Sequence, residues 1–122
     1  MTLALDTSIL IELERRNPII IKKMKELSIL YSLPPYIPFI SYYEFLRGLK
    51  IRGSKDYEKK LAFLNKFNIL KTSKKTAEIL VDLRINYDKL GISLSLADLL
   101  ISSQVIENNL ILVTMDKDFE KI

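Results

Sequence analysis

The sequence predicts an α/β fold in which four parallel strands form one sheet with helices on both faces. Short apolar runs alternate with longer segments whose apolar residues recur at helical spacing, in the order strand, helices, strand, helices, strand, helices, strand. Carboxylates also stand just past several of these apolar runs, where a strand would lead into a helix. This alternation favours a parallel sheet, because crossover helices then cover its two faces.

Breakers and hydrophobic periodicity give the bounds of each predicted element. The predicted strands are residues 2–6, 36–40, 67–71 and 110–114. The predicted helices are residues 7–16, 18–31, 41–51, 55–66, 73–90 and 95–108.

In the first half of the chain, proline-containing segments separate the elements. Ile9, Leu10 and Leu13 fall on one face of the first helix, and Asn17-Pro18 ends that helix and begins the next. The second helix is amphipathic, with lysines on its outer side. Leu33-Pro34-Pro35-Tyr36 is the clearest breaker in the chain and precedes the second strand.

In the second half, glycines and serines give the bounds. Arg52-Gly53-Ser54 forms the turn between the third and fourth helices, and Gly91 closes the fifth helix. Ser41 and Ser95 each stand three residues before an acid, so they predict capping boxes at the third and sixth helices. The last strand follows the sixth helix directly.

The composition is that of one ordinary globular domain spanning residues 1–122. Apolar residues make up 48% and charged residues 28%, and no apolar run is long enough to cross a bilayer. The start of the chain has no secretory signal pattern, so a cytoplasmic protein without a membrane partner is expected. The net charge of +4 permits nucleic-acid binding without requiring it.

Four acids occupy comparable positions along the chain, and they are Asp6, Glu44, Asp98 and Asp116. If the strands are parallel, these acids meet at one edge of the sheet, where open α/β folds place their ligands. Each pair of carboxylates about 5 Å apart repels by roughly 3 kcal/mol at an effective dielectric near 20, so the cluster needs protons or a cation. The chain has no His and no Cys. Only oxygen ligands remain, which favours Mg²⁺ or Mn²⁺.

A purely structural interpretation explains each acid taken singly. Glu44 and Asp98 fit the two capping boxes, Asp6 resembles an N-cap before Thr7, and Asp116 or Asp118 can cap a final turn. The presence of acids at three strand ends and one helix start favours a shared site. The two roles are compatible, because backbone N–H groups at a helix start also orient an acid.

Four segments in this order carry a resemblance to a known family. They are Leu5-Asp6-Thr7-Ser8, the run 43–48 (Tyr-Glu-Phe-Leu-Arg-Gly), Leu96-Ala97-Asp98, and the run 113–119 (Val-Thr-Met-Asp-Lys-Asp-Phe). The set resembles the PIN-domain ribonucleases, most closely the VapC-type toxins of toxin–antitoxin pairs. The resemblance implies a PIN-like three-layer sandwich, in which a short fifth strand often joins the sheet.

The resemblance also implies a function and a set of site residues. The expected function is a metal-dependent endoribonuclease, the toxin of a VapBC-type system. The expected catalytic residues are Asp6, Glu44, Asp98 and Asp116, and Asp6, Asp98 and Asp116 are the expected ligands of one or two Mg²⁺ or Mn²⁺ ions. Asp118 is the alternative fourth acid. The hydroxyls of Thr7 and Thr114 either orient carboxylates or water, or merely cap and pack.

Substrate and partners follow from the same resemblance. Arg47 lies one helical turn beyond Glu44, so it can pair with the acids or with an RNA phosphate. An antitoxin is expected on the apolar faces of residues 7–16 and 18–31, and a homodimer is expected to bring two sites together. Two alternatives share the fold, namely a housekeeping RNA-processing nuclease and a catalytically silent module that binds metal or RNA.

Overall fold

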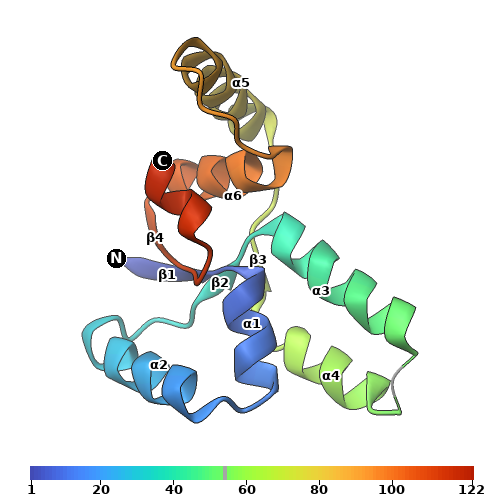
Figure 1. Ribbon diagram of the computed structural model, residues 1–122. Coiled ribbons are helices and arrows are strands. Elements are labelled where there is room, and N and C mark those ends of the chain that lie inside the picture. The colour runs from blue at the N-terminus through green and yellow to red at the C-terminus, as the bar shows by residue number, and fades with distance from the viewer. Residues whose placement is uncertain (54) are drawn as a thin grey trace.

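The computed structural model describes residues 1–53 and 55–122, and four parallel strands in these ranges form one sheet (Figure 1). The order across the sheet is β3-β2-β1-β4. The strands are β1 (Thr2–Leu5), β2 (Tyr36–Ile37), β3 (Asn68–Ile69) and β4 (Leu110–Val113). The helices are α1 (Thr7–Glu14), α2 (Pro18–Leu30), α3 (Phe39–Arg52), α4 (Tyr57–Leu64), α5 (Lys74–Lys89), α6 (Leu96–Glu107) and the 3₁₀ helix η1 (Lys117–Lys121).

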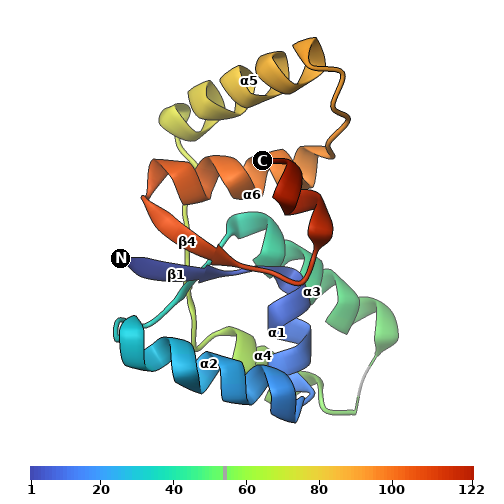
Figure 2. The same ribbon diagram turned by 60° about the vertical axis from the view of Figure 1, so that its left-hand side comes forward.

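Helices lie on both sides of the sheet, as the sequence predicts. In Figures 1 and 2, α1, α2 and α4 lie below the strands, α6 lies above them, and α5 is stacked on the outer side of α6. The predicted α/β architecture is therefore confirmed. Within the described ranges, no fifth strand joins the sheet, and the segment after β4 forms η1 instead.

The main core lies between β1, β2 and the helices below the sheet. It contains Leu5 and Ile37 from the strands, Leu10 from α1, Phe45 from α3 and Leu64 from α4. This packing positions α1 and α3, and two of the predicted acids lie at the N-cap of α1 and in the second turn of α3. None of the helices in the described part of the chain is long and apolar enough to cross a membrane.

The boundary between β2 and α3 differs from the prediction. The second strand ends at Ile37 rather than at residue 40, and α3 begins at Phe39, two residues before the predicted start. Pro38 is the N-cap in extended conformation, and the N–H of Phe39 donates to Oε1 of Gln104 on α6 at 3.0 Å. Ser41 therefore lies inside the helix, so the predicted capping box of Ser41 and Glu44 is wrong.

The other bounds agree within a few residues. β3 is limited to Asn68–Ile69, and α4 begins at Tyr57, two residues after the predicted start. Gly53 and Gly91 follow α3 and α5 in the left-handed conformation, with φ of 56° and 70°, which glycine adopts without steric cost. Ser54, the last residue of the predicted turn after α3, lies outside the described residues.

Ser41 is expected to be dispensable for stability. Its side chain is 0% exposed, and its Oγ has no hydrogen-bond partner within the described part of the chain. Burying an unpaired hydroxyl costs free energy, so Ser41→Ala is expected to leave the free energy of unfolding unchanged or to raise it by about 1 kcal/mol. Thermal unfolding measures this change.

Ser103→Ala is the matched control, because Ser103 is equally buried but its Oγ donates to the carbonyl of Leu99 at 2.7 Å. That variant is expected to lose stability. Equal losses in the two variants would show that the Ser41 hydroxyl is satisfied in solution.

Candidate metal centre

Asp6 directly follows β1 and is the N-cap of α1. Its carboxylate accepts hydrogen bonds from the N–H of Thr7 at 2.6 Å, from Oγ1 of Thr114 at 2.6 Å and from Oγ of Ser8 at 3.5 Å. The residue is only 5% exposed. Donors from both α1 and the end of β4 therefore hold this carboxylate in one orientation.

Glu44 reaches the same region from α3. It lies in the second turn of that helix, and its Oε1 accepts a hydrogen bond from Oγ1 of Thr7 at 2.6 Å. Thr7 thus contacts two acids, since its N–H binds Asp6 and its hydroxyl binds Glu44. One threonine at the start of α1 links the acid after β1 to the acid on α3.

Asp98 lies in the first turn of α6, whose N-cap is Ser95. The N–H of Asp98 donates to Oγ of Ser95 at 3.1 Å, so the predicted serine cap is present. Burial raises the pKa of the Asp98 carboxyl, and the negative charges of Asp116, Asp118 and Asp6 raise it further. The hydrogen bond with Ser95 opposes this shift of the pKa.

Asp116 and Asp118 lie on the segment that follows β4. Asp116 is the N-cap of η1, and its Oδ1 accepts from the N–H of Asp118 at 2.9 Å. The N–H of Asp116 donates to Oγ1 of Thr114 at 3.0 Å, so Thr114 contacts both Asp6 and Asp116. Asp118 also forms an ion pair with Lys121 at 3.4 Å.

The structure brings three of these acids together most closely. Asp98, Asp116 and Asp118 each offer a carboxylate oxygen, and these oxygens lie within 4.8 Å of one another. Asp6 is outside this trio, but its charge acts on Asp98 and Thr114 joins it to Asp116. The sequence offered Asp116 and Asp118 as alternatives for the fourth acid. The structure places both of them beside Asp98, so it does not select one over the other.

Two further residues take part that the sequence did not single out. Oγ of Ser8 accepts from the N–H of Met115 at 3.1 Å, which ties the loop after β4 to the start of α1. Lys121 pairs with Asp118 and so partly neutralises the trio. No local pattern signals the first contact, because Ser8 and Met115 are 107 positions apart in the chain.

The donor set fits a hard divalent cation. All the candidate ligands are carboxylate oxygens, and burial, together with the negative charges of the neighbouring acids, raises the pKa of Asp98 and so disfavours its ionised form. A cation between these groups would reverse that preference, because it stabilises every ionised carboxylate around it. The acidic cluster can therefore hold a metal ion.

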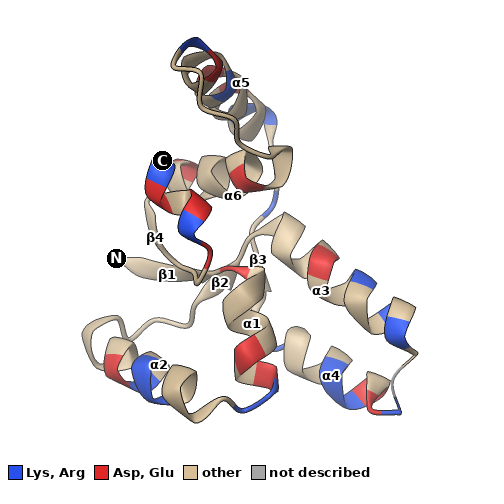
Figure 3. Cartoon of the chain, in the orientation of Figure 1, with Lys and Arg blue, Asp and Glu red and all other residues tan. Residues whose placement is uncertain are grey.

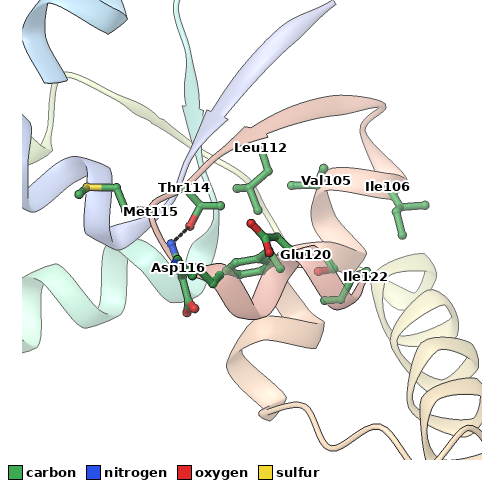
Figure 4. A pocket seen from close by; sticks show the side chains of 11 residues that line it. Val105, Ile106, Leu112, Thr114, Met115, Asp116, Glu120 and Ile122 are labelled. Carbon is green, nitrogen blue, oxygen red and sulfur yellow. Dashed lines mark hydrogen bonds between the residues drawn. The ribbon is translucent and has the colours of Figure 1, made fainter. Parts of the chain in front are cut away.

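Two other features concern ligand binding. A hollow of about 460 Å³ lies between α6, β4 and η1 and has largely apolar walls. Thr114 and Asp116 belong both to its lining and to the acidic region (Figure 4). Arg47 is exposed on α3, and the ion pairs found among the described residues do not include it. The predicted pairing of Arg47 with the acids is therefore not seen.

The metal-free protein is expected to lose stability as the pH rises through the titration range of Asp98. Because the folded-state pKa of this acid is raised, the folded protein binds more protons than the unfolded chain over that range, and stability falls with increasing pH. Thermal melts between pH 4 and pH 7 in chelator measure this. The decline should be smaller in Asp98→Asn, and an equal decline in both proteins would contradict the expectation.

The arrangement of these residues defines a class of protein, an α/β domain with a cluster of acids at the carboxyl edge of a parallel sheet. A model of the PIN domain family matches residues 3–122. The chain therefore belongs to the PIN domain family. A search of curated protein sequences finds no match.

Solved structures of toxin–antitoxin complexes resemble the chain over its full length. VapBC2 from Rickettsia felis, bound to a DNA fragment from its promoter, matches with a TM-score of 0.82 and 24% identity, covering 100% of this chain and 93% of that chain. VapBC-1 from nontypeable Haemophilus influenzae matches with a TM-score of 0.76 and 25% identity, covering 99% of this chain and 92% of that chain. A toxin–antitoxin complex from Klebsiella pneumoniae matches with a TM-score of 0.77 and 27% identity, covering 100% of this chain and 92% of that chain. The predicted VapC-type PIN nuclease is confirmed by this combination.

Proposed function

We propose that this nuclease hydrolyses RNA phosphodiester bonds with Mg²⁺ or Mn²⁺, as the toxin of a VapBC-type pair. The observation that carries this proposal is the convergence of three carboxylates within 4.8 Å of one another beside the buried Asp6. Such a site suits metal-assisted hydrolysis of a phosphodiester. Nucleophilic catalysis through His or Cys is excluded, because the chain contains neither residue.

Asp98 and Asp116 would be the central ligands in this proposal, together with Asp6 and Asp118. A bound Mg²⁺ or Mn²⁺ supplies a water of lowered pKa and screens the phosphate from the acids. Thr114 holds Asp6 and the backbone of Asp116 in fixed positions through two hydrogen bonds. Asp118 serves as a further ligand or as an acceptor of water bound to the ion.

Glu44 has a separate role in the proposal. Its Oε1 is held by the Thr7 hydroxyl, the residue is exposed, and it does not belong to the trio. An exposed, oriented carboxylate at the border of an ion site can accept a proton from the attacking water or hold that water in place. Arg47, one turn further along α3, is proposed to contact a phosphate of the RNA.

The proposed protein partners are an antitoxin and a second copy of the chain. The likeness to VapBC complexes supports an antitoxin. The outer side of α2 exposes Ile19, Ile29 and Leu30, and apolar groups of this kind suit a partner helix that lies across α1 and α2. The homodimer rests on the family resemblance.

Cleavage of RNA by the purified protein tests the proposed function. Single-stranded RNA is expected to be cut with Mg²⁺ or Mn²⁺ and to stay intact in chelator, with activity restored when the metal is returned. The metal should also raise the melting temperature, because it binds only the folded site. Stabilisation by metal without any RNA cleavage would replace the proposal with the silent-module alternative.

A further inference from the structure

The outer side of α3 carries a strip of mixed apolar and basic side chains, which we call the α3 strip. Its residues line a shallow hollow of about 320 Å³ and are Tyr43, Leu46, Arg47, Lys50 and Ile51. Tyr43 is 50% exposed and Ile51 is 66% exposed. Exposed large apolar groups beside cations on one face of a helix suggest a binding surface rather than part of the core.

The structure separates the two neighbouring tyrosines of α3. Tyr42 is half-buried, packs against the main core and donates its hydroxyl to Oδ1 of Asn65 at 3.3 Å. Tyr43 lies outside that cluster and keeps half of its surface in solvent. Only Tyr43 therefore has a ring face available for a ligand.

Arg47 and Lys50 are positioned to bring a polyanion toward the acids. They follow Glu44 at successive steps of three residues, so each lies about 4.5 Å further along the helix axis. Figure 3 shows an acidic band, in red, followed by basic bands, in blue, along α3. Both cations are exposed, and the ion pairs of the described residues join other groups.

Arg52 differs from these two cations. Its Nε donates to the carbonyl of Gly48 at 3.2 Å, so the guanidinium folds back on its own helix. Gly48 makes this possible, because a Cβ at that position would lie 2.7 Å from Nη2 of Arg52. The cations directed outward beyond Glu44 are therefore those of Arg47 and Lys50.

We infer that the α3 strip binds single-stranded RNA on one side of the cleavage site, with a base stacked on Tyr43 and phosphates at Arg47 and Lys50. The inference rests on the proposed function for the class of ligand. Aromatic faces combined with cations along a surface are the features that hold single strands, and stacking requires bases that are not paired in a duplex. Charge complementarity favours RNA over an apolar protein segment on this face.

Binding measured without cleavage tests the inference. A labelled single-stranded RNA is titrated with the protein in chelator, where the RNA stays intact, at several salt concentrations. Arg47→Gln and Lys50→Gln should each reduce the slope of log K against log salt by about 0.7, the value for one phosphate contact of a single strand. Tyr43→Ala should weaken binding by roughly 5- to 150-fold with the slope unchanged, and Tyr43→Trp should retain affinity.

Matched controls lie on other helices. Lys22→Gln removes an exposed cation of α2, and Val81→Ala removes exposed apolar atoms of α5. Neither should change the salt slope or the affinity. Light scattering of each variant records the number of copies in solution, because the α3 strip could instead be covered by a second copy.

Three results would overturn the inference. The first is a salt slope for Arg47→Gln and for Lys50→Gln that equals the slope for Lys22→Gln. The second is an RNA affinity of Tyr43→Ala that equals that of the wild type. The third is a change of oligomeric state caused by Tyr43→Ala. The proposed function fails separately. If wild-type protein binds RNA with these dependences but never cleaves it with metal, the α3 strip stands and the nuclease proposal does not.

Discussion

Asp98→Asn is expected to lower metal-dependent RNA cleavage by at least about 100-fold while leaving the metal-free protein as stable as wild type or more stable. The loss of activity follows because Asp98 faces both Asp116 and Asp118 in the trio. Removing even a residue that only supports a metal ligand commonly lowers metal affinity or activity by about 10- to 100-fold. The gain in stability follows because burial, and then the charges of three other acids, oppose the ionised form of Asp98.

Single-turnover cleavage and thermal melts in chelator measure the two effects of Asp98→Asn together. Asp82→Asn is the matched control, because Asp82 is an exposed acid of α5 outside the trio, and that variant should keep wild-type activity. The assignment of the site fails if Asp98→Asn cleaves RNA at the wild-type rate. A clear drop in the melting temperature of metal-free Asp98→Asn would instead show that the acids do not repel one another.

Gln104→Met is expected to produce the largest loss of stability among single substitutions of polar residues. Gln104 is 0% exposed on α6, its Nε2 donates to the carbonyl of Leu70 at 3.1 Å, and its Oε1 accepts from the N–H of Phe39 at 3.0 Å. Methionine has a similar shape but leaves both backbone groups without this partner, one in a buried and one in a partly buried contact. The expected cost is roughly 2–5 kcal/mol, a fall in melting temperature on the order of 10 °C.

Chemical and thermal unfolding measure the cost of Gln104→Met. Asn108→Ala is the control, because Asn108 lies one turn further along the chain and makes a single side-chain bond to its own helix at an exposed position. That variant should lose far less stability. A loss in Gln104→Met no greater than in Asn108→Ala would mean that water reaches Phe39 and Leu70 and replaces the amide.

The contacts of Gln104 also explain why the start of α3 was predicted two residues late. The sequence around Pro38 suggested that the strand continued to residue 40, since Phe39 and Ile40 are apolar and Ser41 resembles a cap. In the structure the first N–H of α3 is paired by an amide 65 positions away in the chain. A helix end satisfied by a distant side chain leaves no local signal, so the serine was given a role that it does not have.

The candidate site divides in the same way. The position of Asp6 at the end of an apolar run and that of Asp98 at a helix start were visible in the sequence, because strands and helix starts follow local patterns. The grouping of Asp118 with Asp98 and Asp116 was not visible, and it depends on the turn that η1 makes after β4. The hydrogen bond from Thr114 to Asp6 joins residues 108 positions apart.

The sequence by itself determined that the chain forms a parallel α/β fold, that its side chains include no His or Cys to bind a metal, and that the candidate acids stand at the ends of strands and starts of helices. These properties depend on residue type and short-range spacing, which the chain shows directly. Only the tertiary structure decided which carboxylates face one another, which threonines hold them, and that Tyr43 rather than Tyr42 is exposed. Those facts depend on how segments far apart in the sequence pack together. Hydrogen bonds between such segments follow from the packed core rather than from any local pattern.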